Sequence, residues 1–241
     1  MLIKIILGFI YSLFIVISTF TIIKLPFFSN SDILPNIYNM EIISENHGFI
    51  FGIYSSNLQL FMLIFLSLIF NPSIIFISQL VYITIGFIGI PIFYNGGGYE
   101  YLSHPYFGYL IVSFISALVI SFLVHSLRKR ESNTKYSIYS INLNYLFLIS
   151  LVGLFIIQFG GSFTLSMNLN ISWYKILQNS ILVMLPSQIV ILTFISIFAF
   201  FINYIKIIIP NIFYIKRRTE RNNHKKTQIS ENFVYRENFS T

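Results

Sequence analysis

Long apolar stretches separated by short polar connections make up most of this chain. Crossing the hydrocarbon core of a bilayer as a helix takes about 20 mostly apolar residues. Six stretches approach or exceed this length, at residues 4–23, 50–70, 73–93, 106–127, 143–160 and 177–208. The pattern therefore predicts an all-α integral membrane protein with six transmembrane helices.

The two ends of the chain differ in character. The first stretch has a lysine at Lys4 and no small-residue cleavage site after it, so we interpret it as a retained helix and not as a signal peptide. We expect residues 1–209 to form one membrane domain. Residues 210–241 are polar and basic, and we expect a disordered cytoplasmic tail there.

Basic residues predict the orientation of the six helices. With the N-terminus in the cytoplasm, 13 of the 15 Lys and Arg residues fall on the cytoplasmic side, and the exceptions are Lys24 and Lys175. Cytoplasmic loops of membrane proteins carry such an excess. Both termini are therefore predicted to be cytoplasmic, whereas residues 24–49, a glycine-rich loop around Gly96 to Gly98, and residues 161–174 are predicted to face outward.

Composition and charge remove several classes of function. Hydrophobic residues make up 56% and charged residues 10% of the chain, which differs strongly from soluble domains. The chain has no cysteine, so thiolate metal sites and cysteine nucleophiles are excluded. The net charge of +7 does not indicate a nucleic-acid partner, because 8 of the 15 basic residues follow Asn203, around and after the last apolar stretch. Basic residues beside a membrane span usually mark its cytoplasmic side.

Energy coupling and catalysis also lack their usual residues. The second to fifth stretches have no Asp, Glu, Lys or Arg in their cores, whereas ion-coupled transporters commonly need an ionisable residue within the membrane. The glycines at 96–98 are followed by Tyr99 and Glu100, so the lysine of a phosphate-binding loop is missing. The four histidines show no metal-ligand spacing. We predict no enzyme activity, no cofactor and no metal.

Neutral polar residues inside the apolar stretches are the remaining candidates for chemistry. An unpaired primary amide in an apolar medium costs several kcal/mol. Gln59, Gln79, Gln158 and Gln188 must therefore face protein, water or a ligand. Helix packing and a binding site both remain open as explanations, whereas Ser and Gly in these stretches more simply mark close helix contacts.

One long segment resembles a known family. The sequence "YITIGFIGIPIFYNGGGYEYLSHPYFGYLI", residues 82–111, is similar to the BioY family, the biotin-specific S components of energy-coupling-factor transporters. The matching positions are Gly86, Gly89, Pro91, Phe93, Gly96, Gly97, Gly98, Pro105, Gly108, Tyr109 and Leu110. Residues 25–27 and 57–59 resemble two further family motifs.

The resemblance implies an S-component-like bundle that binds biotin or a biotin-like compound from the outer side. It implies two kinds of partner, a transmembrane coupling subunit and ATPase subunits, and a coupling contact whose nearest trace here is Gly8 and Ser12. The membrane would be a bacterial plasma membrane or a plastid membrane. Gly96, Gly97 and Gly98 are expected to belong to a gating loop. The expected ligand-binding residues are Gln59, Gln79, Tyr82, Asn95, Tyr109 and Gln188.

The last stretch departs from the family pattern. The family carries an Asp and a Lys that belong to its ligand site, and this chain has Gln188 and Ile191 in their places. Gln188 can exchange hydrogen bonds with a ureido ring, but Ile191 cannot bind a carboxylate. Either backbone N–H groups or Lys24 bind the carboxylate, or the substrate differs.

A function from another class remains as an alternative. The chain could be a structural or assembly subunit of a larger membrane complex with a decayed ligand pocket. Retention of a ligand on purification distinguishes this role from that of an S component.

Overall fold

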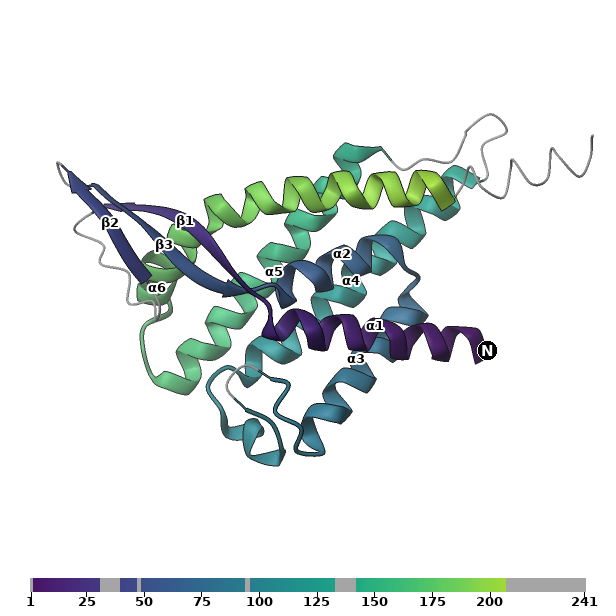
Figure 1. Ribbon diagram of the computed structural model, residues 1–241, viewed down its shortest axis with the longest axis horizontal. Coiled ribbons are helices and arrows are strands. Elements are labelled where there is room, and N and C mark those ends of the chain that lie inside the picture. Colours follow the sequence, from purple (N-terminus) through teal and green to yellow (C-terminus); the bar gives the residue numbers. More distant parts are fainter. Residues whose placement is uncertain (1, 31–39, 47–48, 94–95, 133–141, 207–241) are drawn as a thin grey trace, which may run out of the picture.

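The computed structural model describes residues 2–30, 40–46, 49–93, 96–132 and 142–206. Within these residues, a bundle of helices carries a small antiparallel sheet at one end (Figure 1). The first residues of the first helix and the last residues of the final helix lie at the opposite end (Figure 1). The predicted tail, residues 210–241, lies outside the described residues.

Helices account for most of the described chain. They are α1 (Leu2–Phe20), α2 (Gln59–Ile69), α3 (Pro72–Phe87), α4 (Phe107–Ser132), α5 (Leu143–Leu169), the short α6 (Trp173–Ile176), and a last helix, Leu182–Lys206. A 3-10 turn, η1 (Tyr99–Ser103), precedes α4, and a π-helical turn, η2 (Leu177–Ile181), joins α6 to the last helix. In the described residues, four helices are long and apolar enough to cross a membrane: α1, α4, α5 and the last helix.

The prediction of a membrane-spanning helix at 50–70 was wrong. Residues Phe49–Asn57 form strand β3, and α2 begins only at Gln59 and has 11 residues. A helix of this length extends about 17 Å, which is too short for a hydrocarbon core of about 30 Å. Ile50, Gly52 and Tyr54 are buried and alternate with less buried residues along the strand. A short apolar run has the same hydropathy whether it forms a strand or a helix, so hydropathy alone could not distinguish the two.

Two further boundaries differ from the prediction. The stretch 73–93 is helical only to Phe87, because Gly89 has a φ of 111° and Pro91 follows, and neither fits a continuing helix. The stretch 143–160 extends to Leu169, so most of the predicted outer loop at 161–174 is helical. Asn170, with a φ of 53°, ends that helix in the left-handed conformation.

The sheet corrects the all-α prediction. β1 (Ile22–Asn30) and β2 (Met40–Asn46) both pair antiparallel with the central strand β3, in the order β1-β3-β2. Pro26 lies on the edge strand β1, where a missing N–H is tolerated. Much of the predicted outer loop at 24–49 is therefore a regular sheet that extends from the bundle (Figure 1).

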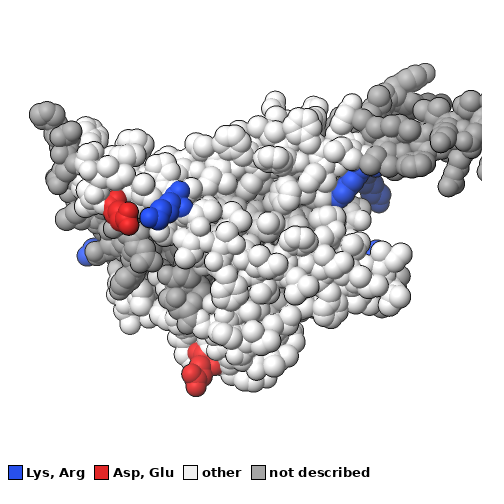
Figure 2. All heavy atoms as spheres, viewed as in Figure 1, with Lys and Arg blue, Asp and Glu red and all other residues white. Residues whose placement is uncertain are grey.

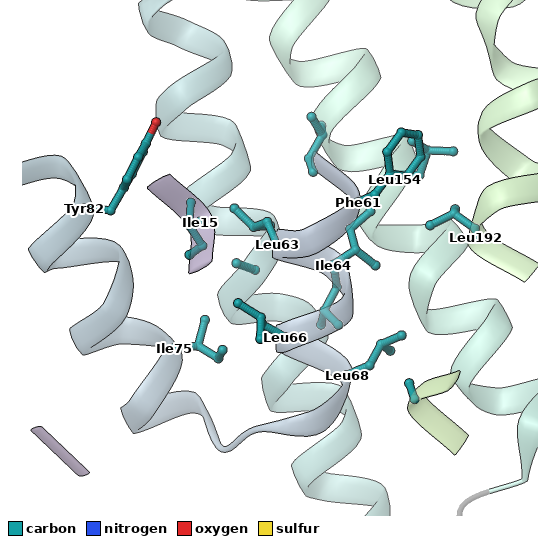
Figure 3. Close-up of a cluster of buried hydrophobic side chains, with 14 of the residues drawn as sticks. Ile15, Phe61, Leu63, Ile64, Leu66, Leu68, Ile75, Tyr82, Leu154 and Leu192 are labelled. Carbon is teal, nitrogen blue, oxygen red and sulfur yellow. The ribbon is translucent and has the colours of Figure 1, made fainter. Parts of the chain in front are cut away.

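The centre of the bundle is α2. Seven of its residues are buried, including Phe61, Ile64 and Leu68. Figure 3 shows this helix surrounded by side chains from other helices, among them Ile15 of α1, Ile75 of α3, Leu154 of α5 and Leu192 of the last helix. A short helix is acceptable here because its neighbours separate it from lipid.

The end of α2 lies inside the bundle and needs hydrogen-bond donors. Arg128 Nη2 donates to the carbonyl oxygens of Leu68 and Ile69 at 3.1 and 3.0 Å. Asn203 Nδ2 donates to Leu68 O at 3.2 Å, and Lys206 Nζ donates to Ile69 O at 3.1 Å. Cationic groups at a helix C-terminus also interact favourably with its dipole.

The first helix packs closely against α3. Gly8 lies against Ile77 and Ser78, and a Cβ at Gly8 would clash with the Ile77 side chain. Ser12 is fully buried as well. Gly8 and Ser12, the expected trace of a coupling contact, therefore pack within the chain. Phe9, Leu13 and Ile17 are among the exposed residues of α1.

Charged side chains lie toward the ends of the molecule. On the face drawn in Figure 2, an uncharged band separates basic side chains at the end where the last helix stops from mixed charges at the sheet end. Large apolar residues of the last helix, such as Val190, Phe194 and Phe198, are exposed. An exposed apolar band between charged ends is the surface that lipid requires.

The predicted orientation can be tested with single cysteines in this cysteine-free chain. We expect Glu100→Cys in η1 to react with a membrane-impermeant thiol reagent in intact cells. Lys4→Cys in α1 should react only after the cells are permeabilised, because the predicted topology places it in the cytoplasm. Reaction of both cysteines in intact cells would contradict the topology.

Candidate functional site

A cavity of about 1420 Å³ lies between the sheet end of the bundle and the loop that follows α3. Its wall is formed by residues of the helices α1 to α6, of the last helix, and of the strands β1 and β3. The lining residues with polar side chains are Thr19, Ser55, Ser56, Asn57, Gln59, Tyr82, Tyr101, Tyr106, Tyr109, Ser113, Gln158, Lys175 and Gln188. An apolar wall with a limited set of polar groups is typical of a small-molecule site.

One polar group of the wall joins α2, α3 and the following loop. Gln59 Nε2 donates to the hydroxyl of Tyr82 at 2.9 Å, and that hydroxyl donates to Ile92 O at 3.1 Å. Tyr82 is 1% exposed and lies at the edge of the buried cluster of apolar side chains (Figure 3). This network fixes the Gln59 amide at the cavity wall.

A second polar group joins α5 to the last helix. Gln158 Nε2 donates to Gln188 Oε1 at 2.8 Å, and both side chains are buried and line the cavity. A glutamine amide has two N–H donors and a carbonyl oxygen with two lone pairs. The N–H groups of Gln188 and the carbonyl oxygen of Gln158 are not used in this bond. The pair therefore presents donors and an acceptor side by side.

Tyr54 connects the sheet to the same region of the last helix. Its hydroxyl lies 3.0 Å from Ser187 Oγ and 3.5 Å from Met184 O. Burial raises the pKa of Tyr54, and hydrogen bonds with Ser187 and Gln188 partly oppose that rise. The hydroxyl thus stays protonated at neutral pH and anchors β3 beside the glutamine pair.

The glycine-rich loop has a defined backbone structure at the cavity wall. Phe93 and Gly96 exchange backbone hydrogen bonds, and Gly98 N donates to Gly86 O at 2.7 Å. Gly98 has a φ of 82°, which favours glycine. A Cβ at Gly97 would meet the Ile90 carbonyl and the Pro91 backbone.

Aromatic packing holds this loop against α3. The ring of Phe93 lies 5.5 Å from that of Tyr82 and 4.7 Å from that of Tyr101. Gly86 lies beneath Phe93, and a Cβ there would clash with the ring. The family-like spacing of Gly86, Phe93 and Gly98 thus has a packing reason.

The structure brings most of the expected ligand-binding residues together. Gln59, Tyr82, Tyr109 and Gln188 line the cavity, as does Gly96 of the expected gating loop. Gly97 and Gly98 follow directly in that loop. Gln79 is 2% exposed and does not line the cavity. Asn95 lies outside the described residues.

Two of the lining residues that were not among the expected ligand-binding residues are Gln158 and Lys175. Gln158 carries the same cost of an unpaired amide as Gln188, and its pairing across 30 positions is visible only in the structure. Lys175 was noted as an exception to the charge rule. Its position as an isolated positive charge on the predicted outer side was the only signal in the sequence that could have indicated a role for Lys175.

The two residues discussed for the missing carboxylate partner lie elsewhere. Ile191 packs against the apolar core and does not line the cavity. Lys24 Nζ lies 3.8 Å from Glu41 Oε1 on the sheet, and both side chains are largely exposed. Lys24 does not line the cavity either.

This set of groups suits binding by neutral hydrogen bonds and aromatic contacts. Among the described residues, no cluster of three or more His, Cys, Asp or Glu side chains could hold a metal ion. Among the described residues that line the cavity, none has a carboxylate or an imidazole side chain.

Comparisons with known proteins agree with this geometry. A model of the BioY family matches residues 48–206. A protein described as a probable biotin transporter BioY, from Lysinibacillus sphaericus, is 50% identical over 60 residues, which is 25% of this chain and 29% of that protein. The matched segment thus spans less than a third of that relative.

The fold is also similar to that of a solved structure, an S-component for biotin from an ECF-type ABC transporter. The two share 21% sequence identity with a TM-score of 0.59, over 82% of this chain and 89% of the solved chain. At this level of sequence identity the similarity shows the fold alone. Because the family model matches more than half of the sequence, this chain belongs to the BioY family.

Proposed function

We propose that this chain is the substrate-binding S component of an energy-coupling-factor transporter and that its ligand is biotin or a biotin-like compound. The observation that carries the proposal is the family match over residues 48–206, which contain nearly all of the cavity wall. The printed descriptions of both similar proteins concern biotin. The ligand assignment rests on these and on the chemistry of the wall.

The glutamine pair is the proposed partner of the ureido ring of biotin. A cyclic urea presents one carbonyl acceptor and two N–H donors, and Gln158 and Gln188 offer the complementary groups. Gln188 thereby takes the place of the family's Asp with a neutral side chain. Tyr82, Tyr109 and Phe93 supply aromatic surface for the fused rings.

The glycine-rich loop is the proposed gate. Pro91, Phe93, Gly96 and Tyr101 contribute to the wall, so movement of this loop would open or close the cavity. Gly89 and Gly98, with positive φ angles, are candidate hinges because glycine adopts several backbone conformations at little cost.

Energy for transport must come from partner subunits, and we propose a transmembrane coupling subunit and ATPase subunits. The chain would act in a bacterial plasma membrane or a plastid membrane. The exposed residues of α1, including Phe9 and Leu13, form the proposed coupling face, since Gly8 and Ser12 pack inside the chain.

Titration of purified protein with biotin tests the ligand assignment. Protein freed of co-purified biotin should bind it saturably in isothermal titration calorimetry. Gln188→Leu should weaken binding by about ten-fold to a hundred-fold, because a ligand hydrogen bond left unpaired costs about 1–3 kcal/mol. No binding by the wild-type protein would refute the assignment and favour a structural role.

Gln79→Leu is a matched control for Gln188→Leu. Both replace a buried glutamine with a side chain of similar size, but Gln79 does not line the cavity. We expect its folded fraction to bind biotin with wild-type affinity. Equal weakening by both variants would indicate a general loss of packing.

The backbone of the gate can be tested with two neighbouring glycines. Gly97→Ala should lower the free energy of unfolding by about 1–3 kcal/mol, as overpacking does, because its Cβ meets the Ile90 carbonyl. Gly96→Ala should leave it unchanged, since the nearest atom to a Cβ there is 3.8 Å away. Thermal unfolding in detergent measures both, and equal midpoints would contradict the loop structure.

A further inference from the structure

Among the described residues that line the cavity, Lys175 has the sole charged side chain. It lies on α6, directly before the π-helical turn that leads to the last helix. Every other polar group of the described wall is a neutral hydroxyl or amide. A cation in such a wall favours a ligand that brings one negative charge.

The short helix that carries Lys175 is held in place. Trp173 Nε1 donates to Ser162 Oγ of α5 at 2.9 Å, and the Trp173 ring packs edge-on against Phe163 at 6.0 Å. Ile176 is buried, and Lys175 N donates to Ser172 O at 3.1 Å. The backbone of Lys175 is therefore fixed at the cavity wall.

Lys175 is also available for a ligand. In the part of the chain that the structure describes, its ammonium group forms no ion pair, whereas Lys24 is paired with Glu41. An ammonium group forms charge-assisted hydrogen bonds with a carboxylate, which are stronger than those with a neutral amide.

The spacing between Lys175 and the glutamine pair suits a ligand with two different ends. Lys175 precedes Gln188 by 13 residues, or about 20 Å along a helix. Lys175 and Gln188 line the same cavity. A ring bound at the glutamine pair would then direct a carboxylate on a flexible chain toward Lys175.

We propose that Lys175 recognises the carboxylate of the ligand and that the cavity thereby selects the free acid over neutral derivatives. This inference rests on the proposed function. It assigns to α6 the cationic role that Ile191 cannot perform, and it replaces Lys24 as the candidate.

Paired titrations with biotin and biotinamide test the proposal. The chain of biotin ends in a carboxylate, whereas that of biotinamide ends in a neutral carboxamide. The wild-type protein should bind biotin at least about ten-fold more tightly than biotinamide. Lys175→Met should lose affinity for biotin and retain affinity for biotinamide, so that the ratio approaches one. Lys175→Arg should keep the preference.

Lys24→Met is the matched control, since it removes an outer-side lysine that is paired with Glu41. It should leave both affinities unchanged. If Lys175→Met keeps the wild-type ratio while the wild type binds biotin, the assignment of Lys175 is overturned and the proposed function stands. If the wild type binds neither compound, the proposed function fails, and this inference fails with it.

Discussion

The structure depends on one constraint: a polar group inside the bundle is costly unless it finds a partner within the protein, because hydrocarbon offers none. The end of α2 shows the constraint most clearly. Its last carbonyl groups lie inside the bundle, and Arg128, Asn203 and Lys206 reach them from two other helices. These contacts let an 11-residue helix end inside the bundle, and the short helix leaves room for a cavity on its other side.

The same constraint shapes the cavity wall. Gln59, Gln158 and Gln188 each take part in a hydrogen bond that joins two helices. Each amide still has donors or acceptors that those bonds do not use. A wall of this kind is stable when empty and can exchange further hydrogen bonds with a polar ring. Gln188 takes part in packing, and its unused groups leave it free for the proposed role in binding, so the two explanations left open by the sequence are compatible.

The sequence predicted those features that depend on local pattern. Long uninterrupted apolar runs identified α4, α5 and the last helix, and the resemblance to the family identified Tyr82 and Gln188, which both line the cavity. The strand β3 was missed because the apolar residues before and after Ser55, Ser56 and Asn57 were interpreted as one run. The Gln158–Gln188 pair joins residues far apart in sequence, so no local pattern could reveal it. Ile191 was expected to share a site face with Gln188, but it packs into the core, since helix rotation is set by neighbouring helices.

The proposed ligand, biotin or a biotin-like compound, would occupy the cavity with its ring at the glutamine pair and its carboxylate toward Lys175. The most direct measurement is an experimental structure of the protein with biotin bound. We expect the ureido ring within hydrogen-bond distance of Gln158 and Gln188, and the carboxylate on the side of α6. Biotin bound outside this cavity, or with its carboxylate at the glutamine pair, would contradict the account.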